Sequence, residues 1–217
     1  TMQYIIDRTH YHRFDIMALN KLPPRSYFIP FSSREKAAAA AAEEKRYTSD
    51  KVRCLSGAWD FRFYPRPAEL PDVLDTDKVD FEHLDVPSCW QFRGYDRPFY
   101  VNTRYQFPYQ PPVIPQEKAV GTVFCWQGAD KGIGPRWMKP EEEYNFVGVY
   151  RKKLTVDMRA MRYVLSFLGV ASCLDLYVNG VFAGYSEGSH NTAEFDITTL
   201  LHAGENELVA VVRRGCT

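Results

Sequence analysis

From Arg53 onward, apolar and polar residues alternate with a period of two, which predicts β-strands with one buried face. The first strand is the clearest, because Trp59, Phe61 and Phe63 alternate with polar neighbours. Further apolar segments follow at residues 150–156, 163–168, 174–178, 181–185, 195–197 and 208–212. Short strands at this spacing predict an all-β fold, a jelly-roll β-sandwich.

One turn between these strands is specified by its residues. Asn179 and Gly180 separate two apolar segments, and a type I′ turn needs positive φ at both of its central positions. The sequence therefore predicts a tight β-hairpin here, with a strand returning from Val181 to Tyr185.

The amino-terminal stretch follows a different pattern. It shows no sustained period up to Phe31, and Pro23 with Pro24 forbids helix, which predicts an extended arm. Ser33 is then a suitable N-cap for a short helix through the alanines at 37–42. We therefore expect two parts: residues 1–46, an extended arm with one short Ala-rich helix, and residues 47–217, the jelly-roll domain.

A long irregular stretch rich in Pro, Tyr and Phe separates the first predicted strand from the one at Tyr150. Prolines keep residues 107–116 extended, and glycines at 128–134 mark a further excursion. Loops of this length in a compact domain are usually functional or lie against another domain.

Charge and composition exclude several classes of protein. The 217 residues carry 27 Lys plus Arg and 27 Asp plus Glu, so there is no basic excess to bind nucleic acid. No apolar run approaches the roughly 20 residues that cross a bilayer, and no apolar signal peptide opens the chain. Five widely spaced cysteines without a CxxC pair argue against a disulfide framework or a zinc site. We expect a cytoplasmic protein that binds neither nucleic acid nor membrane.

Two weak catalytic or metal patterns have simpler explanations. Residues 184–188 fit GxSxG, but Ser186 follows a hairpin strand and precedes another strand, whereas a nucleophile elbow leads into a helix. His10 and His12 lie two residues apart without a third ligand, so we expect surface histidines rather than a metal site. No acid–base pair is evident.

Residues 86–102 are denser in interacting groups than the rest of the chain. Aromatic rings, arginines, an aspartate and an amide alternate there, including Trp90, Asp96, Tyr100 and Asn102. Sugar sites use this mixture, since rings cover the apolar face of a pyranose and planar polar groups bind its hydroxyls. The alternative is that the aromatics pack the edge of the sandwich while Asp96 and the arginines form ion pairs.

The same segment carries a family resemblance. Residues 87–91, 94–98 and 100–102 (PSCWQ, GYDRP and YVN) resemble the amino-terminal sugar-binding domain of glycoside hydrolase family 2 β-galactosidases. The resemblance continues, in order, at the segments 22–31, 111–115, 178–180, 184–189, 193–197 and 204–206. It covers nearly the whole chain, and the family's domain is a galactose-binding-domain-like jelly roll.

The resemblance implies a role for several residues. Asn102 matches the family asparagine that contacts the galactosyl group, and we expect Asn102, Tyr100, Asp96 and Trp90 to bind substrate. The family's second contact, an aspartate in a Trp-x-Asp-Gly motif, has no counterpart at 213–217. Residues 124–146 also depart from the family, which usually runs more directly into the strand at Tyr150.

The family context implies partners outside this chain. An immunoglobulin-like domain and a (β/α)8 barrel follow the domain, and the barrel carries the two glutamates that hydrolyse terminal β-galactosides with retention. We therefore expect a galactoside substrate, an inactive isolated chain, a homo-oligomeric full-length enzyme, and magnesium and sodium only in that parent enzyme. Two alternatives stay open: a free-standing carbohydrate-binding module that stacks sugar on Trp90, Tyr95 or Tyr100, or a scaffold domain of a β-glucuronidase or β-mannosidase.

Overall fold

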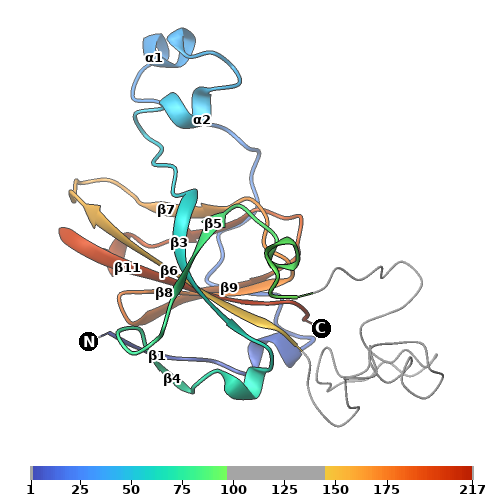
Figure 1. The fold of residues 1–217 in the computed structure, drawn as a ribbon. Coiled ribbons are helices and arrows are strands. Elements are labelled where there is room, and N and C mark those ends of the chain that lie inside the picture. Colours follow the sequence, from blue (N-terminus) through green and yellow to red (C-terminus); the bar gives the residue numbers. More distant parts are fainter. Residues whose placement is uncertain (1, 97–144, 217) are drawn as a thin grey trace, which may run out of the picture.

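The computed structural model describes residues 2–96 and 145–216. They form a central antiparallel sheet of seven strands in the order β2-β9-β8-β11-β6-β3-β5. The bounds of its strands are β2 Ala18–Leu19, β3 Gly57–Tyr64, β5 Glu82–Val86, β6 Val147–Val156, β8 Cys173–Val178, β9 Val181–Glu187 and β11 Gly204–Arg213. Figure 1 shows the long strands β6, β8, β9 and β11 side by side.

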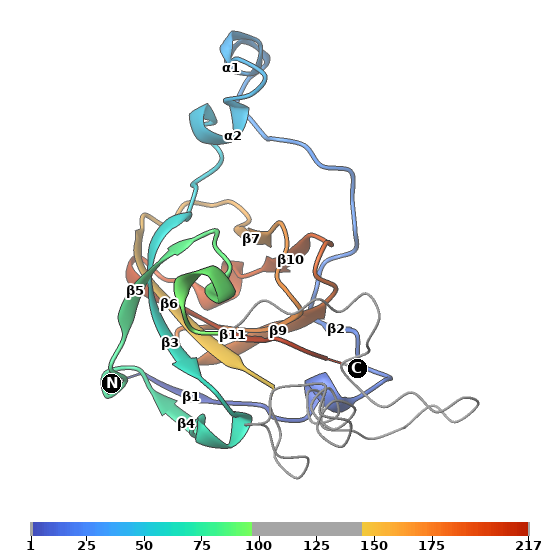
Figure 2. The same cartoon turned by 45° about the vertical axis from the view of Figure 1, so that its right-hand side comes forward.

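A two-stranded sheet covers each face of the central sheet. One pairs β1 (Gln3–Ile5) with β4 (Val73–Asp75), and the other pairs β7 (Val164–Phe167) with β10 (Ala193–Asp196), both antiparallel. Figures 1 and 2 show β1 and β4 below the central sheet and β7 above it. The prediction of an all-β sandwich is confirmed.

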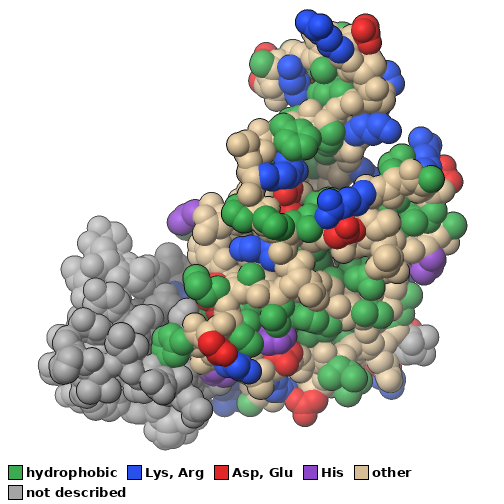
Figure 3. All heavy atoms as spheres, turned by 180° about the vertical axis from the view of Figure 1, so that it is seen from behind, with side chains coloured by type: hydrophobic (Ala, Val, Ile, Leu, Met, Phe, Trp, Pro, Cys, Tyr) green, Lys and Arg blue, Asp and Glu red, His purple; other side chains and the backbone are tan. Residues whose placement is uncertain are grey.

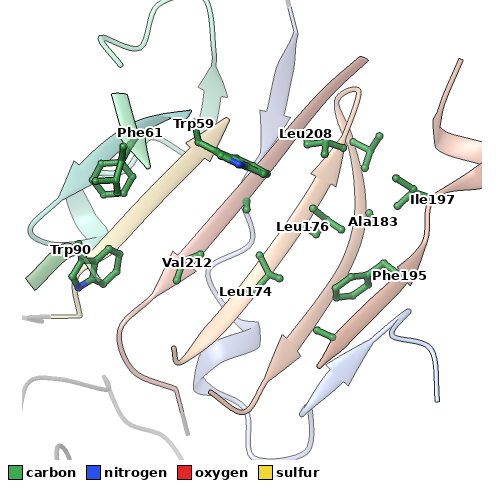
Figure 4. Packing of buried hydrophobic residues seen from close by; sticks show 14 of the residues in the cluster. Trp59, Phe61, Trp90, Leu174, Leu176, Ala183, Phe195, Ile197, Leu208 and Val212 are labelled. Carbon is green, nitrogen blue, oxygen red and sulfur yellow. The ribbon is translucent and has the colours of Figure 1, made fainter. Parts of the chain in front are cut away.

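The double covering explains why β8 is buried along its whole length. Side chains alternate across a strand, so Leu174, Leu176 and Val178 join the core cluster with Phe195 of β10. On the opposite face, Tyr177 packs in a second cluster that includes β1 and β4 residues. Figure 4 shows the first cluster, with Phe195 and Ile197 opposite Leu174 and Leu176.

The hairpin between β8 and β9 has the predicted turn. Asn179 has φ of 50° and Gly180 has φ of 85°, as a type I′ turn requires. The Asn179 side chain also ties the hairpin to β11, because its Oδ1 accepts a bond of 2.8 Å from the Glu207 amide.

The predicted helix forms as α1 (Arg34–Ala39), and the Ser33 side chain caps it by accepting from the Lys36 amide. It ends at Ala39, before the alanine run does, and Ala40 adopts an extended conformation. A second short helix, α2 (Lys45–Thr48), follows, where the sequence predicts only one. Neither helix contains a buried residue, so no tertiary packing extends them.

The two helices lie in a lobe that stands away from the sandwich (Figures 1 and 2). Figure 3 shows charged and apolar side chains mixed over this lobe. The remaining elements are short 3-10 helices: η1 His10–His12, η2 Pro67–Glu69, η3 Trp90–Arg93 and η4 Thr198–Leu200.

Candidate functional site

The predicted sugar-binding segment begins at one end of the sandwich, where three parts of the chain meet. Residues 90–96, residues 145–146 and residues 214–216 after β11 meet there, and we call this the strand-end junction. Asp96 and Asn145 lie immediately on either side of residues 97–144, which are outside the described residues. Tyr100 and Asn102 fall in that range, so their predicted sugar contacts stay predictions.

Trp90 anchors η3 to the central sheet. Trp90 is buried at 5% exposure, and its ring lies near that of Phe61, with ring centroids 6.5 Å apart (Figure 4). The ring of Phe63 lies 5.7 Å from that of Trp90. A Cβ on Gly148 of β6 would lie 2.5 Å from a Trp90 ring carbon, so the indole occupies the space that this glycine leaves. The buried Trp90 ring therefore packs the strand-end junction against the hydrophobic core.

Asp96 is also buried, and its partner is Arg214. The Asp96 Oδ2 accepts from Arg214 Nη1 at 2.8 Å, with side-chain exposures of 2% and 16%. Gln91 Nε2 donates to the same oxygen at 3.3 Å. A carboxylate removed from water needs such charged and polar donors. The pair therefore ties residue 96, the last described residue before the gap, to the end of β11.

The returning chain is fastened to the same place. Asn145 Nδ2 donates to the Gly215 carbonyl and Asn145 Oδ1 accepts from the Gly215 amide, both at 2.9 Å. The Arg214 amide donates to the Phe146 carbonyl at 3.0 Å. These bonds continue the β6–β11 pairing beyond its last register pair, Val147 with Arg213. Asp96 and Asn145, the described residues on either side of residues 97–144, are thus held by Arg214 and Gly215.

Two aromatic residues complete the outer side of the junction. Tyr95 Oη donates to Glu82 Oε2 at 2.7 Å, and this bond to a carboxylate raises the pKa of Tyr95. Phe92 is 80% exposed and was not among the candidates from sequence. An open hollow of about 270 Å³ is lined by Tyr95 and by His83, Leu84, Asp85 and Arg93, the residue that follows Phe92. An exposed ring next to polar groups has the composition of a sugar-binding surface.

Sequence reasoning also missed Arg214 and Asn145. The basic pair at 213–214 is visible in the sequence only as a departure from the family motif. Asn145 carries no motif, although it is buried at 1% exposure and both its polar atoms are bonded. Their roles depend on contacts between distant parts of the chain, which no local pattern reports.

The prediction that Ser186 belongs to a strand, and not to a nucleophile elbow, is confirmed. Ser186 lies within β9, is 5% exposed and accepts a bond of 3.3 Å from Lys21 Nζ. Among the described residues, no group of three or more His, Cys, Asp or Glu could hold a metal ion. Cys54, Cys89, Cys173 and Cys216 are free thiols, while Cys125 lies outside the described residues.

The expectation of a surface histidine is wrong for His10. Its side chain is only 13% exposed, and its Nδ1 lies 2.9 Å from the buried Asp175. The prediction failed because β8 and β9 supply the groups around the ring, namely Asp175, Phe182 and Tyr185.

Within residues 2–96 and 145–216, no helix is long and apolar enough to span a membrane.

Comparison with known proteins gives a family. Residues 52–133 and 135–215 match the family described as glycosyl hydrolases family 2, sugar binding domain. A β-galactosidase of Actinobacillus pleuropneumoniae is 37% identical over 200 residues, which are 91% of this chain and 16% of that protein. A β-galactosidase of Erwinia tasmaniensis is 31% identical over 221 residues, 100% of this chain and 18% of that protein. The chain thus spans less than a fifth of the length of these relatives.

Solved structures of similar shape include two β-glucuronidases. The enzyme of Bifidobacterium dentium is 23% identical with a TM-score of 0.42, over 73% of this chain and 19% of that chain. The enzyme of Faecalibacterium prausnitzii is 17% identical with a TM-score of 0.45, over 74% of this chain and 20% of that chain.

Proposed function

The chain belongs to the sugar-binding domain of family 2 glycosyl hydrolases, and from this premise we propose that it is the amino-terminal part of a β-galactosidase. The observation that carries the proposal is a family match along most of the chain, together with relatives named β-galactosidase over 91% and 100% of it. The enzyme hydrolyses terminal β-galactosides with retention, a reaction that needs two carboxyl groups in another domain. This chain alone has no turnover.

Within that enzyme, the domain presents residues 97–144 to the substrate. Asn102 binds a hydroxyl of the galactosyl group, and Tyr100 also contributes to substrate binding. Trp90 is 5% exposed and the Asp96 side chain is 2% exposed. Both contribute to sugar binding indirectly, because they hold the start of this segment to the sheet. The partners are the galactoside, the immunoglobulin-like domain, the barrel and further copies of the enzyme. Any magnesium or sodium binds in those remaining domains.

A second function is favoured by one feature, the exposed ring of Phe92, whose neighbour in the chain, Arg93, lines the hollow with Tyr95. A free-standing carbohydrate-binding module would stack a pyranose on such a ring. It differs from the first proposal in requiring that the 217-residue chain bind galactosides without other domains.

The experiment extends the reading frame beyond Thr217 and assays the encoded protein on p-nitrophenyl β-galactoside. We expect further domains and turnover, with none from the purified 217-residue chain. A stop codon after Thr217 would overturn the β-galactosidase proposal. Titration of the chain with galactose and lactose, followed by amide chemical shifts, then tests the second function, with Phe92→Ala as the variant that should abolish binding.

A further inference from the structure

A buried charge network lies behind the strand-end junction. Arg213 of β11 and Asp175 of β8 form an ion pair with side-chain exposures of 1% and 0%. His10 of η1 approaches the other carboxylate oxygen, with its Nδ1 2.9 Å from Asp175 Oδ1. Figures 1 and 2 show the blue turn of the amino-terminal segment near the carboxyl-terminal end of the chain.

The network also forms hydrogen bonds with the backbone of the amino-terminal segment. Arg213 Nη2 donates to the Asp7 carbonyl at 2.7 Å, and the Asp7 amide donates to Tyr177 Oη at 3.1 Å. Asp7 Oδ1 accepts from the amides of Thr9 and His10 at 2.7 and 2.9 Å. Residues 7–10 are therefore fixed to β8 and β11 through side chains rather than through a sheet ladder.

The charge balance of this network explains why a protonated histidine stabilises it. Asp7 and Asp175 supply two negative charges and Arg213 one positive charge, so neutral His10 leaves one excess negative charge. Rings of Phe182 and Tyr185 lie 5.3 and 5.2 Å from the imidazole, so little water screens that charge. The hydrogen bond to Asp175 accordingly raises the pKa of His10 against the opposing effect of burial.

Consecutive residues of the same strand end connect the network to the junction. Side chains alternate across a strand, so Arg213 reaches the His10 network while Arg214 reaches Asp96. Ser172 binds both residues, since its amide donates to the Arg213 carbonyl at 2.9 Å and its hydroxyl to the Arg214 carbonyl at 2.6 Å. Ser172 therefore ties the backbone of Arg213 to that of Arg214.

We infer that protonated His10 is a positioning residue: it fastens residues 7–12 across the end of β11 and thereby keeps the Arg214–Asp96 pair in place. Its consequence for sugar binding rests on the proposed function, but the attachment itself does not. The attachment is strongest while His10 carries its proton and weakens as the pH rises through the pKa of His10 in the folded state.

Other titratable groups lie in or next to this network. They are Asp7, Tyr11, Cys173, Asp175, Tyr177, Tyr185, Glu187, Arg213 and Cys216. Burial raises the pKa of Tyr177 and of Tyr185, which keeps both hydroxyls protonated at neutral pH. A hydrogen bond with Cys173, together with burial, raises the pKa of Cys216. Burial also raises the pKa of Glu187, so its contribution to stability falls as the pH rises, in the same direction as that of His10. The part of the pH dependence that belongs to His10 is the part that His10→Gln removes.

The sign follows from linkage. Because the folded-state pKa of His10 lies above its unfolded value of about 6.5, its contribution to stability is complete below about pH 6.5. It is lost as the pH rises from there through the folded-state value.

The test measures amide hydrogen exchange of the 217-residue chain by mass spectrometry between about pH 6 and pH 9, corrected for intrinsic rates. We expect protection of residues 7–12 and 213–216 to fall roughly tenfold across this range, with residues 90–96 following. His10→Gln should show the weak protection at every pH. His202→Gln, at an exposed histidine before β11, should keep the wild-type dependence.

Imidazole titration of the wild-type chain by NMR provides a measurement that needs no variant. We expect His10 to titrate above the ordinary histidine pKa of about 6.5. Titration of His10 at or below about pH 6.5, or unchanged pH dependence in His10→Gln, would overturn the inference. Loosening of residues 7–12 without residues 90–96 would overturn the link to Asp96. None of these outcomes uses a galactoside, so they are distinct from failure of the proposed function.

Discussion

Replacing Arg214 with methionine should lower the free energy of unfolding by about 3 kcal/mol. The change removes the Arg214 cation from the Asp96 carboxylate, whose side chain is 2% exposed, and deleting one partner of a buried pair costs about 3–5 kcal/mol. The lower end applies because Gln91 Nε2 still donates to Asp96 at 3.3 Å and methionine keeps much of the packing against Phe146.

Urea denaturation of the 217-residue chain, followed by circular dichroism, measures this change. With a slope of about 2 kcal/mol per molar urea, the midpoint should fall by about 1.5 M. Arg214→Met combined with Asp96→Asn should recover about 2 kcal/mol, because both members of the charged pair are then neutral. The matched control is Arg62→Met, whose partner Asp80 is 97% exposed at 3.8 Å, and it should cost less than about 1 kcal/mol. Equal, small shifts for Arg214→Met and Arg62→Met would refute the reasoning.

Two further changes test the packing beneath the junction. Gly148→Ala should cost about 1–3 kcal/mol in the same urea assay, because the new methyl group would lie 2.5 Å from the Trp90 ring and 2.8 Å from Phe61; an unchanged midpoint would contradict this packing. Tyr4→Phe should cost about 1–2 kcal/mol, since Glu207 Oε1 loses its 2.7 Å donor and keeps only Thr76, and a midpoint at or above that of the wild type would exclude this role for the hydroxyl.

Local sequence patterns predict most strands of the central sheet. The alternation around Trp59 and the Asn179-Gly180 turn predict β3 and the β8–β9 hairpin, because strand period and positive φ are properties of a few adjacent residues. The short strands β4 and β5 were missed, since each buries only one residue, Leu74 or Leu84. Three to five residues with one apolar position give no readable period.

The candidate site was predictable in part. Aromatic and polar density marked residues 86–102, but the burial of Trp90 depends on Gly148, far along the chain. The same holds for Arg214 with Asp96 and for His10 with Asp175, which meet only when β11 and β8 are in place. Such pairs are set by tertiary packing, so no local pattern around either residue contains them.

The measurement that tests the central claim most directly is the kcat/KM of the complete enzyme on p-nitrophenyl β-galactoside, with and without Asn102→Ala. The account predicts a higher kcat/KM for the β-galactoside than for the matching β-glucuronide. It also predicts a loss of roughly 10- to 100-fold in kcat/KM for Asn102→Ala, the value of one hydrogen bond to a sugar hydroxyl. Preference for the β-glucuronide, or an unchanged kcat/KM in Asn102→Ala, would contradict it.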